Sequence, residues 1–196
     1  GHWDSLEPIE SLSDAEMDSV LESELEQKFV NALGAYAAER ADCTWQSRLH
    51  NGKLVWELGI GDARWLIEPQ VFLGPAQGVA IPSMPDFVCW PQGTAEDAIR
   101  PVAIFTDGFA YHVRPHTALG GLPDDLQKRR SLLQSGRFAV WSITWDDVQE
   151  FAEHNLMTMS PFNNAQYGIA DRALRQAGSP LAVGLLRDNA VGQLVG

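Results

Sequence analysis

The sequence has little of what builds a disulfide-stapled or membrane-spanning protein. Among its 196 residues there are two cysteines, Cys43 and Cys89, and neither belongs to a Cys-x-x-Cys pair. A disulfide framework is therefore excluded, and a reducing cytoplasmic location is expected. The longest uncharged stretch, Pro69 to Pro85, is interrupted by Pro75 and Pro82, so it cannot form a continuous membrane helix. We expect no membrane partner.

Basic residues are also scarce, with 14 Lys and Arg against 26 Asp and Glu and a net charge of −12. Residues 1–26 hold nine acids and no Lys or Arg, which leaves 17 acids against 14 bases in the rest of the chain. We expect residues 1–22 to form an acidic N-terminal segment. The start of the chain, Gly1-His2-Trp3, lacks an initiating Met and resembles a tag remnant, which suggests a domain cut from a longer protein.

Such an acidic balance does not favour nucleic-acid binding, which depends on neutralising phosphates. One window, residues 114–137, nevertheless carries a net charge of +3. It could bind DNA or form an ordinary solvated helix face. Its candidate DNA-binding residues are Arg114, Lys128, Arg129 and Arg130.

The first half of the chain combines a helical pattern with a strand meander. Apolar residues recur at helical spacing from Asp14 to Arg40. Three apolar runs follow, and Asn51-Gly52 joins the first two with residues typical of a tight hairpin turn. The predicted strands of this antiparallel meander are Thr44–His50, Lys53–Gly59 and Arg64–Phe72.

The second half alternates strands and helices. Two strands are expected at Asp86–Pro91 and Pro101–Thr106, with a polar loop between them. Pro123 is expected to open a helix that ends at Gly136. The further predicted elements are a strand at Phe138–Ile143, a helix over Trp145–His154 capped by Thr144 and Asp147, and short helices at Ala170–Ala177 and Pro180–Asn189.

This order predicts an α/β fold, a mixed central sheet flanked by helices. The strands at Asp86–Pro91 and Pro101–Thr106 should be antiparallel neighbours, because a short polar loop joins them. The strand at Phe138–Ile143 should return to the same sheet through a helical crossover.

That pairing would gather polar residues at one end of the sheet. Asp86 would start one strand, while Thr106, Asp107 and His112 would follow the end of its neighbour. A carboxylate and a backbone carbonyl suit Mg²⁺, which keeps several waters and binds few protein ligands. An imidazole titrates near neutral pH, so His112 could accept a proton from an attacking water.

The residues that carry this pattern resemble a known family. They are Pro85–Val88, the run Phe105-Thr106-Asp107-Gly108 with His112, Asp125 eleven residues before Gly136, and Val140-Trp141. Together with Ser23-x-x-Glu26 upstream, they are similar to the very-short-patch-repair endonucleases of the PD-(D/E)XK nuclease superfamily. The resemblance implies a restriction-endonuclease-like core at residues 23–155, with a helical extension at residues 156–196.

The resemblance also implies roles for individual residues. Asp86 would bind the metal, Mg²⁺ or Mn²⁺ in its place, together with the carbonyl of Thr106. His112 would be the catalytic base, and Glu26 and Asp125 would support the site. Asp107 stands where the repair enzymes have His. The implied activity is Mg²⁺-dependent hydrolysis of DNA phosphodiester bonds.

The superfamily's acid-x-Lys motif is absent, because Phe105 and Asp107 occupy its two positions. This departure keeps a second hypothesis open, a nuclease-like module that binds DNA or protein without efficient cleavage. The pattern also resembles the C-terminal portion of large bacterial DEAD/DEAH-box helicases, some of them in phage-defence loci. A helicase domain in the same polypeptide is therefore an expected partner.

Each candidate residue also has a plainer interpretation. Asp86 after Pro85 could start a turn, and Asp107-Gly108 is itself a turn signal. His112 could be an ordinary loop histidine, Asp125 could interact with a helix dipole, and Glu22 or Glu24 could take the place of Glu26. A metal-free acidic interaction domain is the third hypothesis, and only the net charge favours it.

Overall fold

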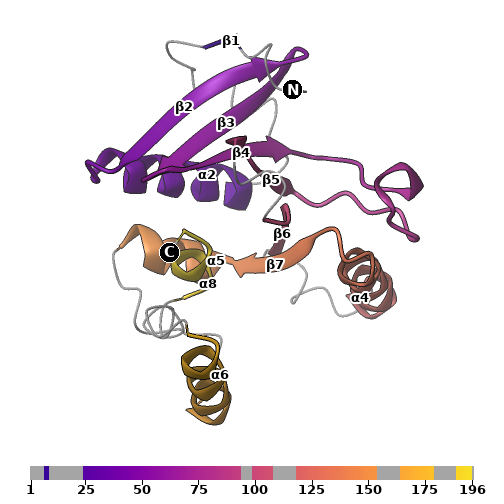
Figure 1. The fold of residues 1–196 in the computed structure, drawn as a ribbon. Helices are drawn as coiled ribbons and strands as arrows, with labels where there is room; N and C mark the ends of the chain where they lie inside the picture. The colour runs from indigo at the N-terminus through magenta and orange to yellow at the C-terminus, as the bar shows by residue number, and fades with distance from the viewer. Residues whose placement is uncertain are drawn as a thin grey trace. The chain divides into compact units, whose positions relative to one another are not determined.

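The computed structural model describes residues 7–8, 24–93, 99–107, 118–153, 164–178 and 189–195. The chain forms two compact units, Gly1–Ser142 and Ile143–Gly196 (Figure 1). The elements of the first unit, in chain order, are β1 (Glu7–Pro8), α2 (Glu24–Ala38), β2 (Cys43–His50), β3 (Lys53–Ile60), β4 (Ala63–Pro69), the 3-10 helix η1 (Pro75–Gln77), β5 (Phe87–Pro91), β6 (Val102–Asp107), α4 (Ala118–Gln134) and β7 (Ala139–Thr144), the last of which ends in the second unit. The second unit continues with α5 (Trp145–Ala152), α6 (Asn164–Gln176) and α8 (Ala190–Val195).

The strands form one sheet in the order β1-β2-β3-β4-β5-β6-β7. Strands β2, β3 and β4 pair antiparallel in succession, which confirms the predicted meander. Asn51 and Gly52 form the first turn with φ angles of 51° and 76°. Both central residues of a tight hairpin turn need positive φ, and Asn and Gly tolerate it best.

Strands β5 and β6 are antiparallel neighbours, as predicted, with Phe87 opposite Ile104. The chain then passes through α4 to β7, the next strand in the sheet. The amide of Ala139 donates to the carbonyl of Pro101 at 2.9 Å, which joins the beginnings of the two strands as in a parallel pair. The sheet is therefore mixed, and the expected α/β class with flanking helices is confirmed.

Successive residues of β5 point to opposite faces of the sheet. Phe87 packs on α2, where its ring centroid lies 5.4 Å from that of Phe29. Trp56 of β3 meets the same ring edge-on at 6.4 Å. These three side chains are fully buried and form the core under α2.

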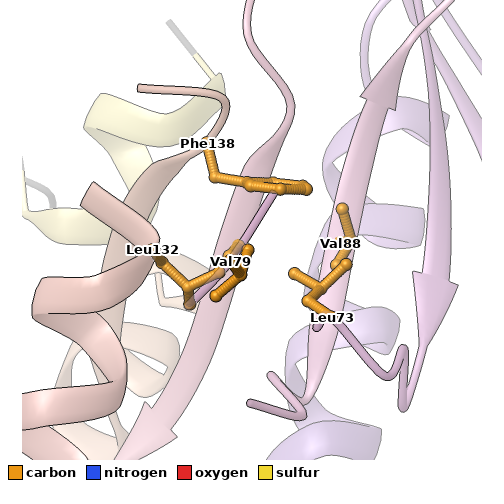
Figure 2. Packing of buried hydrophobic residues seen from close by; sticks show 6 residues of the cluster. Leu73, Val79, Val88, Leu132 and Phe138 are labelled. Carbon is orange, nitrogen blue, oxygen red and sulfur yellow. The ribbon is translucent and has the colours of Figure 1, made fainter. Parts of the chain in front are cut away.

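Val88 belongs to the opposite face, which α4 covers (Figure 2). The buried cluster on this face is Leu73, Val79, Val88, Ala103, Leu132 and Phe138. Full burial of each large aliphatic or aromatic side chain contributes about 1.5–3 kcal/mol. The two cores hold β5 and β6 between α2 and α4, and so fix the place where β5 begins and β6 ends.

Helix α4 differs from the prediction at its start. It begins at Ala118, so Pro123 lies inside the helix rather than at its first position. A proline there removes one backbone hydrogen bond without ending the helix, because its own φ is helical. The predicted end is confirmed: the helix stops at Gln134, and Gly136 follows with a φ of 68°. The predicted helical residues before Glu24 lie outside the described part of the chain.

In the second unit, Thr144 caps α5 as predicted. The other helices differ from the prediction, since α6 is longer than residues 170–177 and α8 begins after Asn189. The side-chain Oδ1 of Asn189 accepts from the amide of Gly192 at 2.9 Å, which caps α8, while its Nδ2 donates to the carbonyl of Asp147 at 2.9 Å. Most of the predicted helix Pro180–Asn189 lies outside the described residues, and so does His154.

None of the helices that the structure describes has the length and apolar composition needed to cross a bilayer.

Candidate functional site

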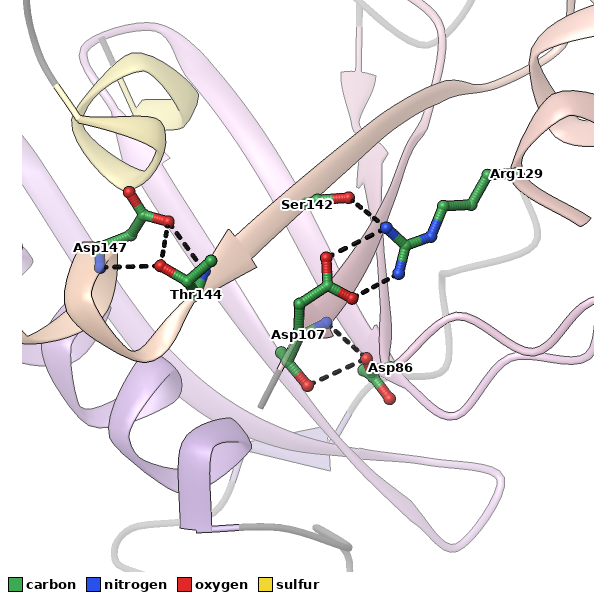
Figure 3. Close-up of polar contacts among 7 residues, drawn as sticks. Asp86, Asp107, Arg129, Ser142, Thr144 and Asp147 are labelled. Carbon is green, nitrogen blue, oxygen red and sulfur yellow. Dashed lines mark hydrogen bonds and ion pairs between the residues drawn. The ribbon is translucent and has the colours of Figure 1, made fainter. Parts of the chain in front are cut away.

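Asp86 and Thr106 meet at one end of the sheet. Figure 3 shows Asp86 together with Asp107 and Arg129. Asp86 directly precedes β5 and Thr106 is near the end of β6, so the antiparallel pairing brings them together. Oδ2 of Asp86 accepts two hydrogen bonds from Thr106, one from the backbone amide at 2.6 Å and one from the hydroxyl at 3.0 Å. The contact between these two candidate metal ligands is therefore direct.

The Asp86 carboxylate is poorly compensated despite these donors. Burial raises its pKa above the ordinary value, and this effect outweighs the two Thr106 donors, which lower it. The charge of Asp107 raises the pKa further, whereas Arg129 lowers it. Within the described part of the chain, Oδ1 of Asp86 accepts no hydrogen bond. A cation placed at this oxygen would offset the cost of burying the charge.

Asp107 forms an ion pair with Arg129 of α4. Nη2 of Arg129 lies 2.5 Å from Oδ1 of Asp107, and Nη1 lies 3.0 Å from Oδ2, so both carboxylate oxygens are engaged. Nη1 also donates to Oγ of Ser142 on β7 at 2.8 Å. The guanidinium lies over the Phe105 ring, 4.6 Å from its centroid. Arg129, predicted to contact DNA, is thus engaged within the protein.

Glu26 of α2 is connected to Asp86 through Gln70. The Glu26 side chain is 2% exposed, and its Oε2 accepts from Nε2 of Gln70 at 3.3 Å. The backbone amide of Gln70 donates to the carbonyl of Asp86 at 2.9 Å. Glu26 is therefore linked to the backbone of Asp86 through one intervening residue.

Gln70 was missed by the sequence analysis. It follows β4 with a φ of 50°, a left-handed conformation that costs a residue other than glycine about 1–2 kcal/mol. Its carbonyl accepts from Nζ of Lys53 at 3.1 Å. No motif in the sequence marks this position, because its importance comes from contacts with α2, β3 and the start of β5.

The remaining candidates fall into two groups. Asp125 lies on α4 four residues before Arg129, hence one turn away on the same side of the helix. Lys128 forms an ion pair with Asp124 at 2.6 Å, and Arg130 is exposed. His112 and Arg114 lie outside the described residues, as do all residues between β6 and α4.

The described residues suit a cation that needs few protein ligands. They contain no group of three or more His, Cys, Asp or Glu side chains placed to share a metal ion. None of the described residues donates a hydrogen bond to Oδ1 of Asp86, which lies beside Thr106. Mg²⁺ is commonly held by one or two carboxylates together with waters and substrate phosphates, so this donor set fits an open Mg²⁺ site.

Comparison with family models, with curated proteins and with solved structures finds no match for this chain.

Proposed function

We propose that the chain is a Mg²⁺-dependent DNA endonuclease domain with a restriction-endonuclease-like core. The observation that carries the proposal is the pairing of Asp86 with Thr106 where β5 begins and β6 ends. The antiparallel β5–β6 pair, the return through α4 to β7 and the buried Glu26 on α2 support the same assignment.

In this proposal Asp86 and the carbonyl of Thr106 hold the ion, or Mn²⁺ in its place. When bound there, Mg²⁺ would polarise the attacking water and neutralise charge on the phosphodiester. His112 accepts the proton from the attacking water, while Glu26 and Asp125 orient the site. Lys128, Arg130 and Arg114 contact the DNA backbone. The domain serves a larger DNA-processing or phage-defence protein with a helicase domain in the same polypeptide.

The test is cleavage of supercoiled and linear DNA in the presence of Mg²⁺ or Mn²⁺. Asp86→Asn should lower the rate by at least about 100-fold, since it removes the charged ligand and keeps the side-chain shape. His112→Ala should lower it by about 10²–10⁴-fold. Asp62→Asn, an exposed aspartate in the turn between β3 and β4, is the matched control and should cleave at the wild-type rate. Equal rates for wild type and Asp86→Asn would refute the proposal.

A second function is favoured by one observation, the complete engagement of Asp107 with Arg129. With Phe105 and Asp107 at the positions of the acid-x-Lys motif, the described site has few charged groups available for catalysis. On this reading the chain is a nuclease-like module that binds DNA or protein for a helicase. Such a module would bind a duplex in an electrophoretic shift assay but leave it intact with either metal.

A further inference from the structure

Asp107 is close to the candidate cation site but blocked from it. It follows Thr106 directly, and its charge acts on Asp86. Both of its oxygens accept hydrogen bonds from Arg129, so a metal would have to compete with the guanidinium for this carboxylate. The site therefore has a second carboxylate that becomes a better metal ligand when Arg129 binds another partner.

Arg129 is suited to exchanging partners. Its side chain is 22% exposed and that of Asp107 is 35% exposed, so the ion pair lies within reach of solvent. The guanidinium fork matches phosphate oxygens as well as carboxylate oxygens. The ion pair also leaves the Nε–H of Arg129 buried without a hydrogen-bond partner in the described residues. An arrangement that adds an acceptor would satisfy this group better.

We propose that Arg129 exchanges partners. In the free protein Arg129 pairs with Asp107 and blocks it. When Arg129 binds a DNA phosphate instead, Asp107 is released to the cation site. This inference rests on the proposed nuclease function and adds a coupling between substrate and metal. Because binding free energies are linked, DNA must tighten metal binding by the same factor by which metal tightens DNA binding. The ion pair thus keeps the cation site incomplete until DNA is present.

The first experiment measures Mn²⁺ affinity, without DNA, in a double-mutant cycle of Asp107→Asn and Arg129→Met. Removing Arg129 frees Asp107 as a ligand, so Asp107→Asn should weaken Mn²⁺ binding at least about 10-fold more in the Arg129→Met background than in the wild type. A pure effect of charge would be the same in both backgrounds. Additive effects would therefore overturn the proposal. Circular dichroism melts verify folding, and Arg129→Lys, which keeps the charge but lacks the fork, is the second variant and should show a smaller coupling.

The second experiment measures binding of a fluorescent blunt-ended duplex by anisotropy, with and without Ca²⁺, a hard cation with the same preference for oxygen ligands. Wild-type protein should bind the duplex at least about 10-fold more tightly with Ca²⁺, and Arg129→Met should lose most of this enhancement. Arg137→Met removes an equal charge from an exposed residue that follows α4 and should keep the enhancement. Equal enhancement in wild type and Arg129→Met would contradict the inference.

The two proposals fail in different ways. If Asp86→Asn leaves Mn²⁺ binding unchanged, the nuclease function fails and the inference fails with it. If Mn²⁺ binding depends on Asp86 but the Asp107–Arg129 cycle is additive, the inference alone is wrong.

Discussion

Asp86 accepts two hydrogen bonds from one neighbouring residue and is still poorly neutralised. Hydrogen bonds from a backbone amide and a hydroxyl favour the ionised carboxylate, but burial disfavours it more strongly. A carboxylate in this state is costly to the fold and attractive to a cation. The balance between these effects is measurable in the metal-free protein.

We expect Asp86→Asn to stabilise the metal-free protein at neutral pH. The raised pKa means that the folded state favours protonated Asp86. The stabilisation from the protonated form is fully present below the unfolded-state pKa and is lost as pH rises through the folded-state pKa. The melting temperature of the variant should therefore exceed that of wild type at pH 7, and the difference should shrink toward pH 3. For a chain of this size each kcal/mol shifts the midpoint by about 2–4 °C.

Thermal melts between pH 3 and pH 8 in EDTA check this prediction. Asp62→Asn, at an exposed turn, is the matched control for the substitution. A variant that is less stable than wild type at pH 7, by a margin that shrinks toward pH 3, would show that ionised Asp86 stabilises the fold.

Among the elements, α5 shows how a short helix is defined by its first turn. The amide of Thr144 donates to Oδ2 of Asp147 at 2.8 Å, and the Thr144 hydroxyl donates to the same oxygen at 2.6 Å. Oγ1 of Thr144 also accepts from the amide of Asp147 at 3.3 Å. These reciprocal bonds satisfy groups that an eight-residue helix would otherwise leave without partners.

Thr144→Ala should destabilise α5 by about 1–2 kcal/mol, because it removes the cap and leaves a buried carboxylate with fewer donors. Thr144→Ser keeps the hydroxyl and should cost less than about 0.5 kcal/mol. Amide hydrogen exchange at residues 146–149 is the direct measurement, with faster exchange expected only for the alanine variant. Equal protection in both variants would mean that packing, rather than the cap, holds the helix.

Elements with local determinants were predictable from the sequence. Asn51-Gly52 has the backbone preferences of its turn, and Thr144 with Asp147 has the spacing of a capping box, so neighbouring residues suffice. The antiparallel pairing of β5 and β6 followed from their short connection. The predicted start of α4 was wrong because proline is common at the first position of a helix, and Pro123 was assigned to that position. A proline deeper in a helix is also tolerated, at a cost in stability.

Contacts between the helices and the sheet could not be predicted from the sequence. The Asp86–Thr106 contact joins residues 20 positions apart, and it could be predicted because it follows from the antiparallel pairing of β5 and β6. The Arg129–Asp107 ion pair needs α4 to lie on a particular face of the sheet, and a basic run does not reveal which of its members turns inward. The Gln70 contacts involve residues 44 positions apart in sequence and a backbone conformation that glutamine rarely adopts.

At the scale of the whole molecule, the net charge of −12 favours cation binding in general. Specific binding at Asp86 must therefore be separated from screening of the acidic segment at residues 1–22. Since an open Mg²⁺ site with few protein ligands binds weakly, we take a dissociation constant of about 1 mM as the working value.

With that affinity, 10 mM Mg²⁺ should stabilise the folded protein by about 1.4 kcal/mol. The melting temperature should rise by about 3–6 °C. Sodium chloride of matched ionic strength should produce a smaller rise, and Asp86→Asn should show only that smaller rise with either Mg²⁺ or Mn²⁺. An equal response of wild type and Asp86→Asn would favour the module that does not cleave DNA.

The left-handed backbone of Gln70 places two demands on one position. Glycine, asparagine and aspartate adopt this conformation at the lowest cost. All three side chains are shorter than glutamine, and glycine and aspartate also lack the side-chain amide that donates to Glu26. Glutamine has the reach and the donor but not the backbone preference. Backbone stability and the Glu26 contact therefore favour different residues at position 70, and glutamine is a residue that keeps the contact.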